Sequence, residues 1–308
     1  MTIALVHRHK AFLPAIHGYT QFFNREGIRC EAVTPGELAS LPHQVEWHFM
    51  GIDQTPVKKG IYKIHEYLSP STPPFQALKD LGKRLLNSRP DLRIYKNEYV
   101  QRCMGIHDQV PFCFQDVGIA EEWLTPSATQ YDKEFDFIYV GELSAKRKPE
   151  LLIDRFTRPD MQQHTLLLLS RHYAHLQEQY HQYPNIIFKG PVAKPEVKEY
   201  ILRSRFAINY MPDIEPFNQL TSTKFLEYAA CGIPIVSTDY PWVRNFRREY
   251  GGNYLLVSPN LWELNWEHAT SFPYHTPDMS QWTWEQQIRK SGVLNHLETR
   301  FPECHFQP

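Results

Sequence analysis

The sequence predicts an α/β protein with two Rossmann-like domains, and three observations support this prediction. Short apolar runs alternate with helical patterns in the first half of the chain, and a second series of the same kind begins at residue 135. Such alternation is typical of strands that crossover helices join into a parallel sheet. The length of 308 residues suits two domains of about 150 residues better than one.

The first half predicts strands and helices in alternation. The predicted helices lie at residues 17–26, 75–87 and 98–104. The second of these is amphipathic, because it repeats apolar side chains at helical spacing, namely Phe75, Leu78, Leu81 and Leu85. The apolar runs predict strands at 2–6, 30–33, 45–50, 61–65 and 92–95.

A polar stretch at 125–134 separates the two halves and is predicted to be a linker, because it has no apolar periodicity. The second half again alternates. Its helices are expected from about residue 149 and at 194–203, 224–230 and 283–298. Its strands are expected at 135–140, 165–169, 185–188, 206–210, 233–237 and 254–256.

Composition excludes several classes of protein. The formal net charge is −1 without a long run of one sign, so the basic footprint of a nucleic-acid-binding protein is absent. The five cysteines are scattered without a CxxC pair, which argues against a zinc site or a disulfide framework and suits a reducing cytoplasm. No apolar run approaches the ~18 residues of a membrane span. The basic segment around Lys79, Lys83 and Arg84 leaves peripheral contact with the inner face of a membrane open.

The most informative run lies at residues 221–238, where a polar turn leads into a short helix that Gly232 and Pro234 end. Lys224 and Glu227 are three residues apart, so both lie on one face of that helix. A cation suits a phosphate, and the two oxygens of a carboxylate can accept hydrogen bonds from both hydroxyls of a sugar diol. The run therefore favours a ligand with a phosphate at one end and a sugar at the other.

A second run follows the strand predicted at 135–140. Gly141 forms the turn, and three cations follow it at Lys146, Arg147 and Lys148. A glycine between a strand and a helix lets the backbone approach a phosphate, and the helix N-terminus adds a positive dipole end. The cations can add fixed positive charge for a diphosphate.

Both runs resemble the donor site of GT-B glycosyltransferases of the group 1 family, which includes enzymes like glycogen synthase and sucrose synthase. The first resembles the pattern Lys-x-x-Glu-Tyr-x-Ala-x-Gly-x-Pro-Ile-Val, and the second Val-Gly-x-Leu-x-x-x-Lys. In register, Arg147 takes the lysine position of the second pattern and Lys148 falls where glycine is common. The resemblance implies that Lys224 contacts the diphosphate and that Glu227 binds the ribose hydroxyls.

The resemblance also implies the GT-B architecture: two Rossmann-like domains facing across a cleft, with a C-terminal helix that returns to the N-terminal domain. We expect an acceptor domain at residues 1–127, a donor domain at 128–278, and a returning helix and tail at 279–308. Trp282 and Trp284 open the last helix and are expected to pack rather than to stack on a sugar.

The sequence departs from the family at one position. Many retaining members carry a glutamate eight residues before the position of Glu227, and this chain has Gln219 there. Retention and inversion therefore both stay open. The remaining candidates for donor contact are Arg171 after the strand at 165–169, Glu215 and Asn218 near Gln219, and the polar turn Thr221, Ser222 and Thr223.

Candidates for a catalytic base in the first half are weaker. His17 and Gly18 are expected at the turn after the first strand, and an imidazole there could accept the proton of an acceptor hydroxyl, as in inverting relatives. His65 and Glu66 follow the fourth strand and are lower candidates, because adjacent side chains on a strand diverge.

The expected function is transfer of a sugar from a nucleotide sugar to a glycan or lipid-linked acceptor, without metal or cofactor. By resemblance, the context is surface polysaccharide synthesis. Two alternatives stay open: a sugar-nucleotide epimerase of the same fold, and a non-catalytic subunit that binds a nucleotide sugar or glycan. A dehydrogenase is disfavoured because no GxGxxG follows the first strand.

Overall fold

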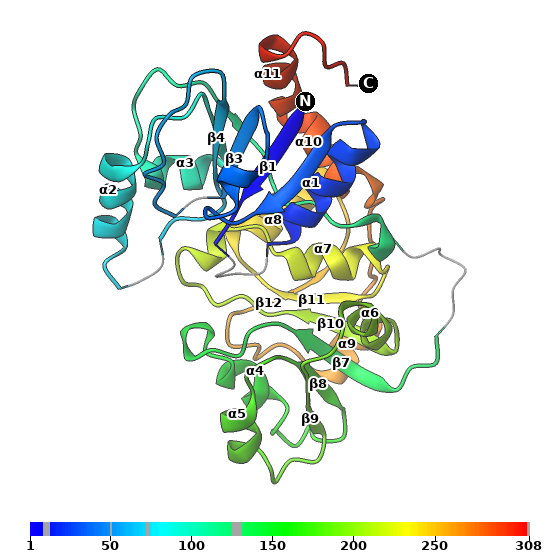
Figure 1. The fold of residues 1–308 in the computed structure, drawn as a ribbon. Coiled ribbons are helices and arrows are strands. Elements are labelled where there is room, and N and C mark those ends of the chain that lie inside the picture. Colours follow the sequence, from blue (N-terminus) through cyan, green and yellow to red (C-terminus); the bar gives the residue numbers. More distant parts are fainter. Residues whose placement is uncertain (9–12, 50, 72–73, 125–130, 307–308) are drawn as a thin grey trace. The chain divides into compact units, whose positions relative to one another are not determined.

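The computed structural model describes residues 1–8, 13–49, 51–71, 74–124 and 131–306, and it divides into two compact units (Figure 1). Unit 1 comprises Met1–Ala120 and Gln281–Pro308, and unit 2 comprises Glu121–Ser280. The sequence placed these boundaries after residues 127 and 278. Of the predicted linker at 125–134, residues 125–130 lie outside the described part of the chain.

Unit 1 is built on a parallel sheet of six strands in the order β2-β1-β3-β4-β5-β6. Five of these strands were predicted, and each lies within two residues of its expected bounds. β6 was missed because it has only three residues. The strands are β1 (Thr2–Val6), β2 (Arg29–Val33), β3 (Val45–Phe49), β4 (Tyr62–Tyr67), β5 (Leu92–Tyr95) and β6 (Phe112–Phe114). Its helices are α1 (Pro14–Arg25), α2 (Gln76–Leu86), α3 (Glu98–Met104), α10 (Trp284–Ser291) and α11 (Val293–Arg300), with a short 3-10 turn at Leu38–Ser40.

The C-terminal segment belongs to the core of unit 1, as the resemblance implied. Trp284, Ile288 and Leu297 are buried in the same apolar cluster as α1 and the first strands. The predicted helix at 283–298 is in fact two helices. Gly292 separates α10 from α11 because its φ of 82° lies in the left-handed region, which a continuous α-helix cannot adopt.

Unit 2 repeats the architecture with a parallel sheet in the order β12-β11-β10-β7-β8-β9. All six strands were predicted, and their bounds agree within two residues. They are β7 (Phe135–Val140), β8 (Leu166–Leu169), β9 (Ile186–Lys189), β10 (Ser204–Asn209), β11 (Ile235–Thr238) and β12 (Leu255–Val257). The helices are α4 (Glu150–Arg155), α5 (Ala174–Gln179), α6 (Lys194–Leu202), α7 (Thr223–Ala230), α8 (Pro241–Tyr250) and α9 (Trp266–Ser271), of which α5, α8 and α9 were not predicted.

The cores of both units consist of apolar strands covered by helices, so the predicted α/β fold class is confirmed. Parallel sheets need cover on both faces, which explains the continuous burial of a strand such as β8, whose four leucines are all buried. Within the described residues, no helix has the length and apolar character needed to cross a membrane.

Candidate functional site

The sheet of unit 2 has a switch point between β7 and β10. The chain starts at β7, adds β8 and β9 on one side, and then crosses to place β10, β11 and β12 on the other. Ligands of such sheets bind at the carboxyl ends of the two strands where the order reverses. A cavity of about 270 Å³ lies there, lined by the ends of β7 and β10, the loop after β7 and the first turn of α7.

The loop after β7 closes one side of this cavity. A Cβ on Gly141 would lie 2.7 Å from the hydroxyl of Tyr139, which donates a hydrogen bond to the carbonyl of Glu142, so a side chain there would displace this hydroxyl. The segment then forms a 3-10 turn at Ala145–Arg147 before the six-residue helix α4. The helix expected from about residue 149 thus begins at Glu150, and the turn separates it from Gly141, so positive charge beside this glycine comes mainly from side chains.

Arg147 lines the cavity and retains hydrogen-bonding capacity. Its guanidinium lies over the ring of Phe217, 5.1 Å from the centroid, and its Nε is 3.9 Å from the Glu142 carboxylate. That distance is too long for a hydrogen bond, and the buried Nε has no hydrogen-bond partner within the described part of the chain. Arg147 is thus a cation with an unsatisfied donor beside a cavity, as an anion site requires.

Its neighbour Lys148 has a different position. Lys148 is exposed, and its φ of 49° is in the left-handed region. This explains why glycine is common at the matching place in the family pattern, since glycine adopts that conformation without steric cost.

The first turn of α7 forms the opposite wall. Ser222 caps the helix by accepting a hydrogen bond from the Phe225 backbone N–H at 3.2 Å, and its own hydroxyl donates to Asn209 Oδ1 at 2.7 Å. Asn209 is buried at the end of β10 and donates to Ser237 and Tyr240. This network fixes the start of α7, whose first backbone N–H groups have no partner within the helix.

Lys224 and Glu227 lie on one face of α7, as expected, and contact each other. Lys224 Nζ is 2.5 Å from Glu227 Oε2. Lys224 lines the cavity and is partly exposed, whereas Glu227 is buried. The next residue, Tyr228, accepts a hydrogen bond from the backbone N–H of Val140 at 2.9 Å, which joins α7 to the end of β7. The two sequence runs are therefore parts of one site.

Six of the predicted donor residues line this cavity: Gly141, Arg147, Thr221, Ser222, Thr223 and Lys224. The other six do not appear among the described residues that line it, namely Lys148, Arg171, Glu215, Asn218, Gln219 and Glu227. Arg171 and Glu215 are exposed, and the amide of Asn218 donates to Asp213 at 2.8 Å. Sequence reasoning missed Tyr139, Asn209, Tyr210 and Met211, of which Asn209 had a signal as a polar residue at the end of an apolar strand.

His17 is not in a turn. It is exposed on α1, which begins at Pro14, and the adjacent Gly18 has a packing role. A Cβ on Gly18 would lie 2.3 Å from Cγ of Trp284, and one on Gly118 would lie 2.6 Å from the backbone nitrogen of Trp284. The expectation of a glycine turn facing the donor is therefore wrong, because this glycine lets the C-terminal helix pack against α1.

His65 and Glu66 are buried on opposite faces of the unit 1 sheet. Glu66 accepts hydrogen bonds from Tyr19 at 2.9 Å and Trp47 Nε1 at 2.7 Å, and burial raises its pKa to about 7. Burial lowers the pKa of His65, whose Nε2 is 3.1 Å from Asp53. Because the strand directs the two side chains apart, they cannot form the base and orienting acid considered from the sequence.

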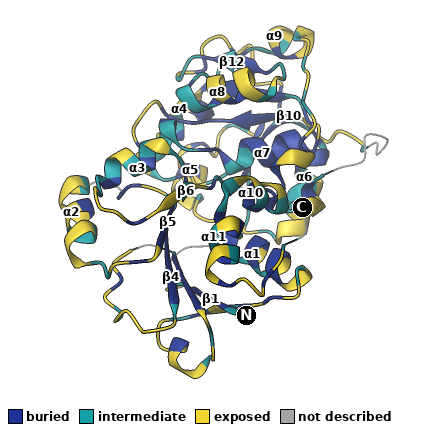
Figure 2. Cartoon of the chain, turned by 90° about the horizontal axis from the view of Figure 1, so that it is seen from above, coloured by how far each residue is buried: buried dark blue, intermediate teal, exposed yellow. Residues whose placement is uncertain are grey.

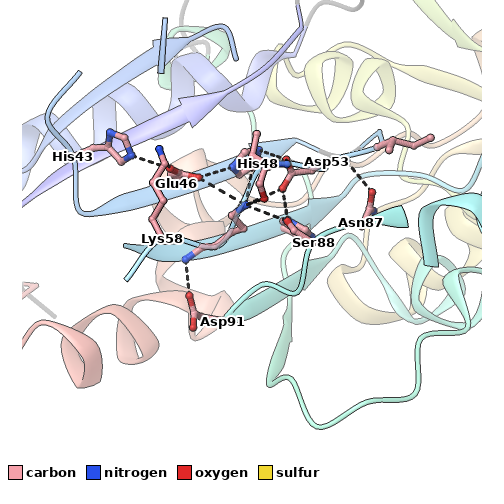
Figure 3. Close-up of polar contacts among 12 residues, drawn as sticks. His43, Glu46, His48, Asp53, Lys58, Asn87, Ser88 and Asp91 are labelled. Atoms are coloured by element: carbon pink, nitrogen blue, oxygen red, sulfur yellow. Dashed lines mark hydrogen bonds and ion pairs between the residues drawn. The ribbon is translucent and has the colours of Figure 1, made fainter. Parts of the chain in front are cut away.

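The face that carries His65 holds a buried cluster of charged groups (Figure 3). Asp53 accepts from Lys63 Nζ at 3.2 Å and from Ser88 at 2.8 Å, while Glu46 contacts His43, His48 and Lys58. Burial opposes ionisation of both acids, yet hydrogen bonds from these neighbours lower the pKa of Glu46 to about 2 and that of Asp53 below its usual value. The two acids are thus ionised and fully engaged.

Two further observations concern metals and thiols. Within the described ranges, no group of three or more histidine, cysteine, aspartate and glutamate side chains is arranged to hold a metal ion. None of the five cysteines, all of which are described, forms a disulfide.

Comparison with known proteins supports the sequence motifs. Residues 134–265 match the family described as glycosyl transferases group 1. This match covers both runs of unit 2 and confirms the resemblance. No curated protein matches the sequence.

Solved structures match both units together. A sucrose-phosphate synthase from Thermosynechococcus elongatus aligns with a TM-score of 0.69 and 12% identity over 97% of this chain and 99% of that one. AviGT4, a glycosyltransferase involved in avilamycin A biosynthesis, aligns with a TM-score of 0.61 and 12% identity over 98% and 97%. Anabaena HepE in complex with UDP-glucose aligns with a TM-score of 0.59 and 13% identity over 97% and 92%. At these identities the likeness establishes the fold, which is the GT-B fold that the motifs implied.

Proposed function

Because unit 2 matches a glycosyltransferase family and the whole chain has the fold of such enzymes, we propose that the protein transfers a sugar from a nucleotide-sugar donor to a glycan or lipid-linked acceptor. The observation that carries this proposal is the cavity at the β7/β10 switch point, where Arg147, Lys224 and the first turn of α7 meet. Two cations and several backbone N–H groups around one cavity suit a diphosphate.

The proposed mechanism places the leaving diphosphate between the two walls of the cavity. The guanidinium of Arg147 donates to one phosphate oxygen, and Lys224 turns from Glu227 to the other phosphate. Once Lys224 has moved, the Glu227 carboxylate can accept hydrogen bonds from the ribose hydroxyls. Positive charge fixed in place stabilises the charge that develops on the leaving group, so we propose that the reaction needs no metal ion or cofactor.

Calorimetric titration with UDP-, GDP-, ADP- and CMP-sugars tests donor binding. Arg147→Gln should weaken binding of the best donor about tenfold to a hundredfold, because a hydrogen bond to a charged group contributes about 1.5–3 kcal/mol. Lys146→Gln is the matched control, since Lys146 is an exposed cation in the same loop that is not among the residues lining the cavity. Equal losses in the two variants would mean that only the net charge of the loop matters.

Glu227→Ala tests the ribose contact separately. We expect it to weaken nucleotide-sugar binding while leaving inorganic diphosphate binding nearly unchanged, because the carboxylate is assigned to the sugar diol. Unchanged affinity for the best nucleotide sugar would remove Glu227 from the site.

A screen of donor hydrolysis and transfer, with and without EDTA, tests catalysis. The proposal expects turnover with at least one donor and no effect of EDTA. Tight donor binding without turnover would favour the non-catalytic binding subunit, for which the uncharged Gln219 in place of the family glutamate is the supporting observation. Conversion of the donor sugar to its epimer without transfer would identify an epimerase.

A further inference from the structure

Helix α2 in unit 1 carries an apolar stripe, which normally packs against the core of a protein. In this helix the stripe faces outward. At 3.6 residues per turn, Leu78 and Leu85 lie about 160° and about 140° around the helix from Asp80. Asp80 is the one side chain of α2 that is buried among the described residues, whereas Leu78 and Leu85 are 66% and 73% exposed. Figure 2 shows α2 as a largely exposed helix at the edge of its unit.

The contacts of Asp80 fix this orientation. Its carboxylate accepts a hydrogen bond from the backbone N–H of Ser71 at 3.1 Å and pairs with Lys83 Nζ at 3.2 Å. Releasing Asp80 to turn the leucines inward would leave a buried N–H group unsatisfied. The outward stripe is therefore held by polar contacts on the inner side of the helix.

The stripe continues beyond the two leucines. Phe75, which precedes the helix, is 74% exposed, and Leu81 and Leu86 are also exposed. Monomeric proteins seldom expose five large apolar side chains on and beside one helix, and a group of this kind marks an interaction surface. We define the surface by these five residues: Phe75, Leu78, Leu81, Leu85 and Leu86.

The charges beside this surface indicate its partner. Between residues 74 and 89 the chain carries three exposed cations, Lys79, Arg84 and Arg89, whereas Lys83 is paired with Asp80, the one acid of this stretch. The whole chain is nearly neutral, so this excess of cations is local. A second copy of the same surface would bring like charges together, whereas an anionic lipid surface would attract them.

We propose that α2 binds the interface of a bilayer that contains anionic phospholipid. The apolar stripe would enter the boundary between headgroups and acyl chains, and the exposed cations beside it would contact the headgroups. An amphipathic helix with both features has the two attractions that interfacial binding needs. This inference concerns unit 1 alone and does not rest on the proposed transfer reaction, so either can fail without the other.

Cosedimentation with vesicles tests the inference on the full chain, without donor or acceptor. Binding should be stronger to vesicles of phosphatidylcholine mixed with phosphatidylglycerol than to phosphatidylcholine alone, and it should weaken as salt is raised. Failure of the unaltered protein to bind the mixed vesicles would overturn the proposal, and this outcome needs no variant.

Variants separate the apolar and electrostatic parts. L78Q combined with L85Q should lower the vesicle partition coefficient about tenfold or more, because both side chains lose their apolar transfer energy. L151Q is the matched control, since Leu151 is an exposed leucine on α4 in unit 2. Because Leu78 and Leu85 are already exposed, their exchange leaves the Asp80 contacts intact, and circular dichroism would verify that the fold is kept.

The charge test compares K79Q combined with R84Q against R248Q, which removes an exposed cation on α8. The first variant should lose the preference for anionic lipid, and the second should keep it. Sedimentation velocity gives the competing outcome. If the leucine variant turns a dimer into a monomer and vesicle binding is absent, a second copy covers this surface and the membrane proposal is wrong.

Discussion

Both units place their first strand inside a six-stranded parallel sheet, and both have a switch point, between β1 and β3 in unit 1 and between β7 and β10 in unit 2. A cavity lies at each. The one in unit 2 has a volume of about 270 Å³, whereas the one in unit 1, lined by residues such as Arg8, His48 and Asp53, has only about 30 Å³. One topology thus provides an open cavity in unit 2 and little space in unit 1.

The difference lies in what the polar side chains bind. In unit 1, Asp53 accepts hydrogen bonds from Lys63, His65 and Ser88, so its ligand-binding capacity is used within the unit. In unit 2, Arg147 keeps an unsatisfied Nε and Lys224 is partly exposed. Charged residues at the carboxyl ends of strands therefore indicate a ligand site only where they keep donors or acceptors available beside an open cavity.

Exchange of Asp53 tests whether the unit 1 cluster is structural. Asp53→Ala should lower the free energy of unfolding by about 3–5 kcal/mol, because it leaves the buried Lys63 without its closest carboxylate. Glu98→Ala is the control, since Glu98 makes an exposed ion pair with Arg102 on α3 and should change stability by less than about 1 kcal/mol. Urea unfolding measures both variants. A small effect of Asp53→Ala, together with weaker acceptor binding, would reassign the cluster to a ligand site.

The next largest effect on stability is expected from Glu66, which lies on the opposite face of β4. Burial raises the pKa of Glu66 from 4.5 to about 7 in the folded protein. Between these two pH values the folded protein keeps the proton of Glu66, whereas the unfolded chain has lost it. The free energy of unfolding should therefore fall as the pH rises from about 4.5 to about 7, by up to about 3 kcal/mol, and stay level above that. Glu66→Gln cannot titrate, so the difference between the two stability curves isolates this carboxyl from the histidines. Parallel curves would mean that Glu66 titrates normally.

The strand–helix alternation made the fold predictable because it is a local property of the sequence. The cavity of unit 2 was also predictable in outline, because its two walls are continuous runs after β7 and at the start of α7. The network of Asn209, Ser237 and Tyr240 was not, since it joins β10, β11 and the residue before α8, and no local pattern relates residues on three elements.

In unit 1, one feature was beyond the reach of the sequence and one prediction was wrong, and both have physical causes. The periodicity of α2 showed an apolar stripe but could not show that Asp80 would hold the stripe outward. His17 was placed in a turn because the helix was expected to start there, whereas Pro14 starts it. Proline suits the first helical turn, where no backbone N–H is needed, so Pro14 was the signal that could have corrected this boundary.

The glycines extend the comparison. Gly18 in unit 1 faces the indole of Trp284, whereas Gly141 in unit 2 lines the cavity. Gly18→Ala should destabilise the protein by about 1–3 kcal/mol through overpacking. Trp284→Leu should relieve this cost, which a double-mutant cycle followed by thermal unfolding can measure. Gly118→Ala meets the backbone of Trp284, so the same leucine should give no relief there. Equal relief in both cycles would contradict the packing described for α10.

The smallest effect is expected at Lys148, which follows Arg147 in the unit 2 loop. Its φ of 49° costs a residue with a side chain about 1–2 kcal/mol, and glycine recovers most of this while adding entropy to the unfolded chain. Lys148→Gly should therefore raise the free energy of unfolding by about 0.5–1 kcal/mol. Because Lys148 is exposed and is not among the described residues that line the cavity, donor affinity should stay the same in calorimetry. A loss of affinity equal to that of Arg147→Gln would show that the loop binds the diphosphate through both cations. The unsatisfied donor of Arg147 would then not be the feature that distinguishes unit 2 from unit 1.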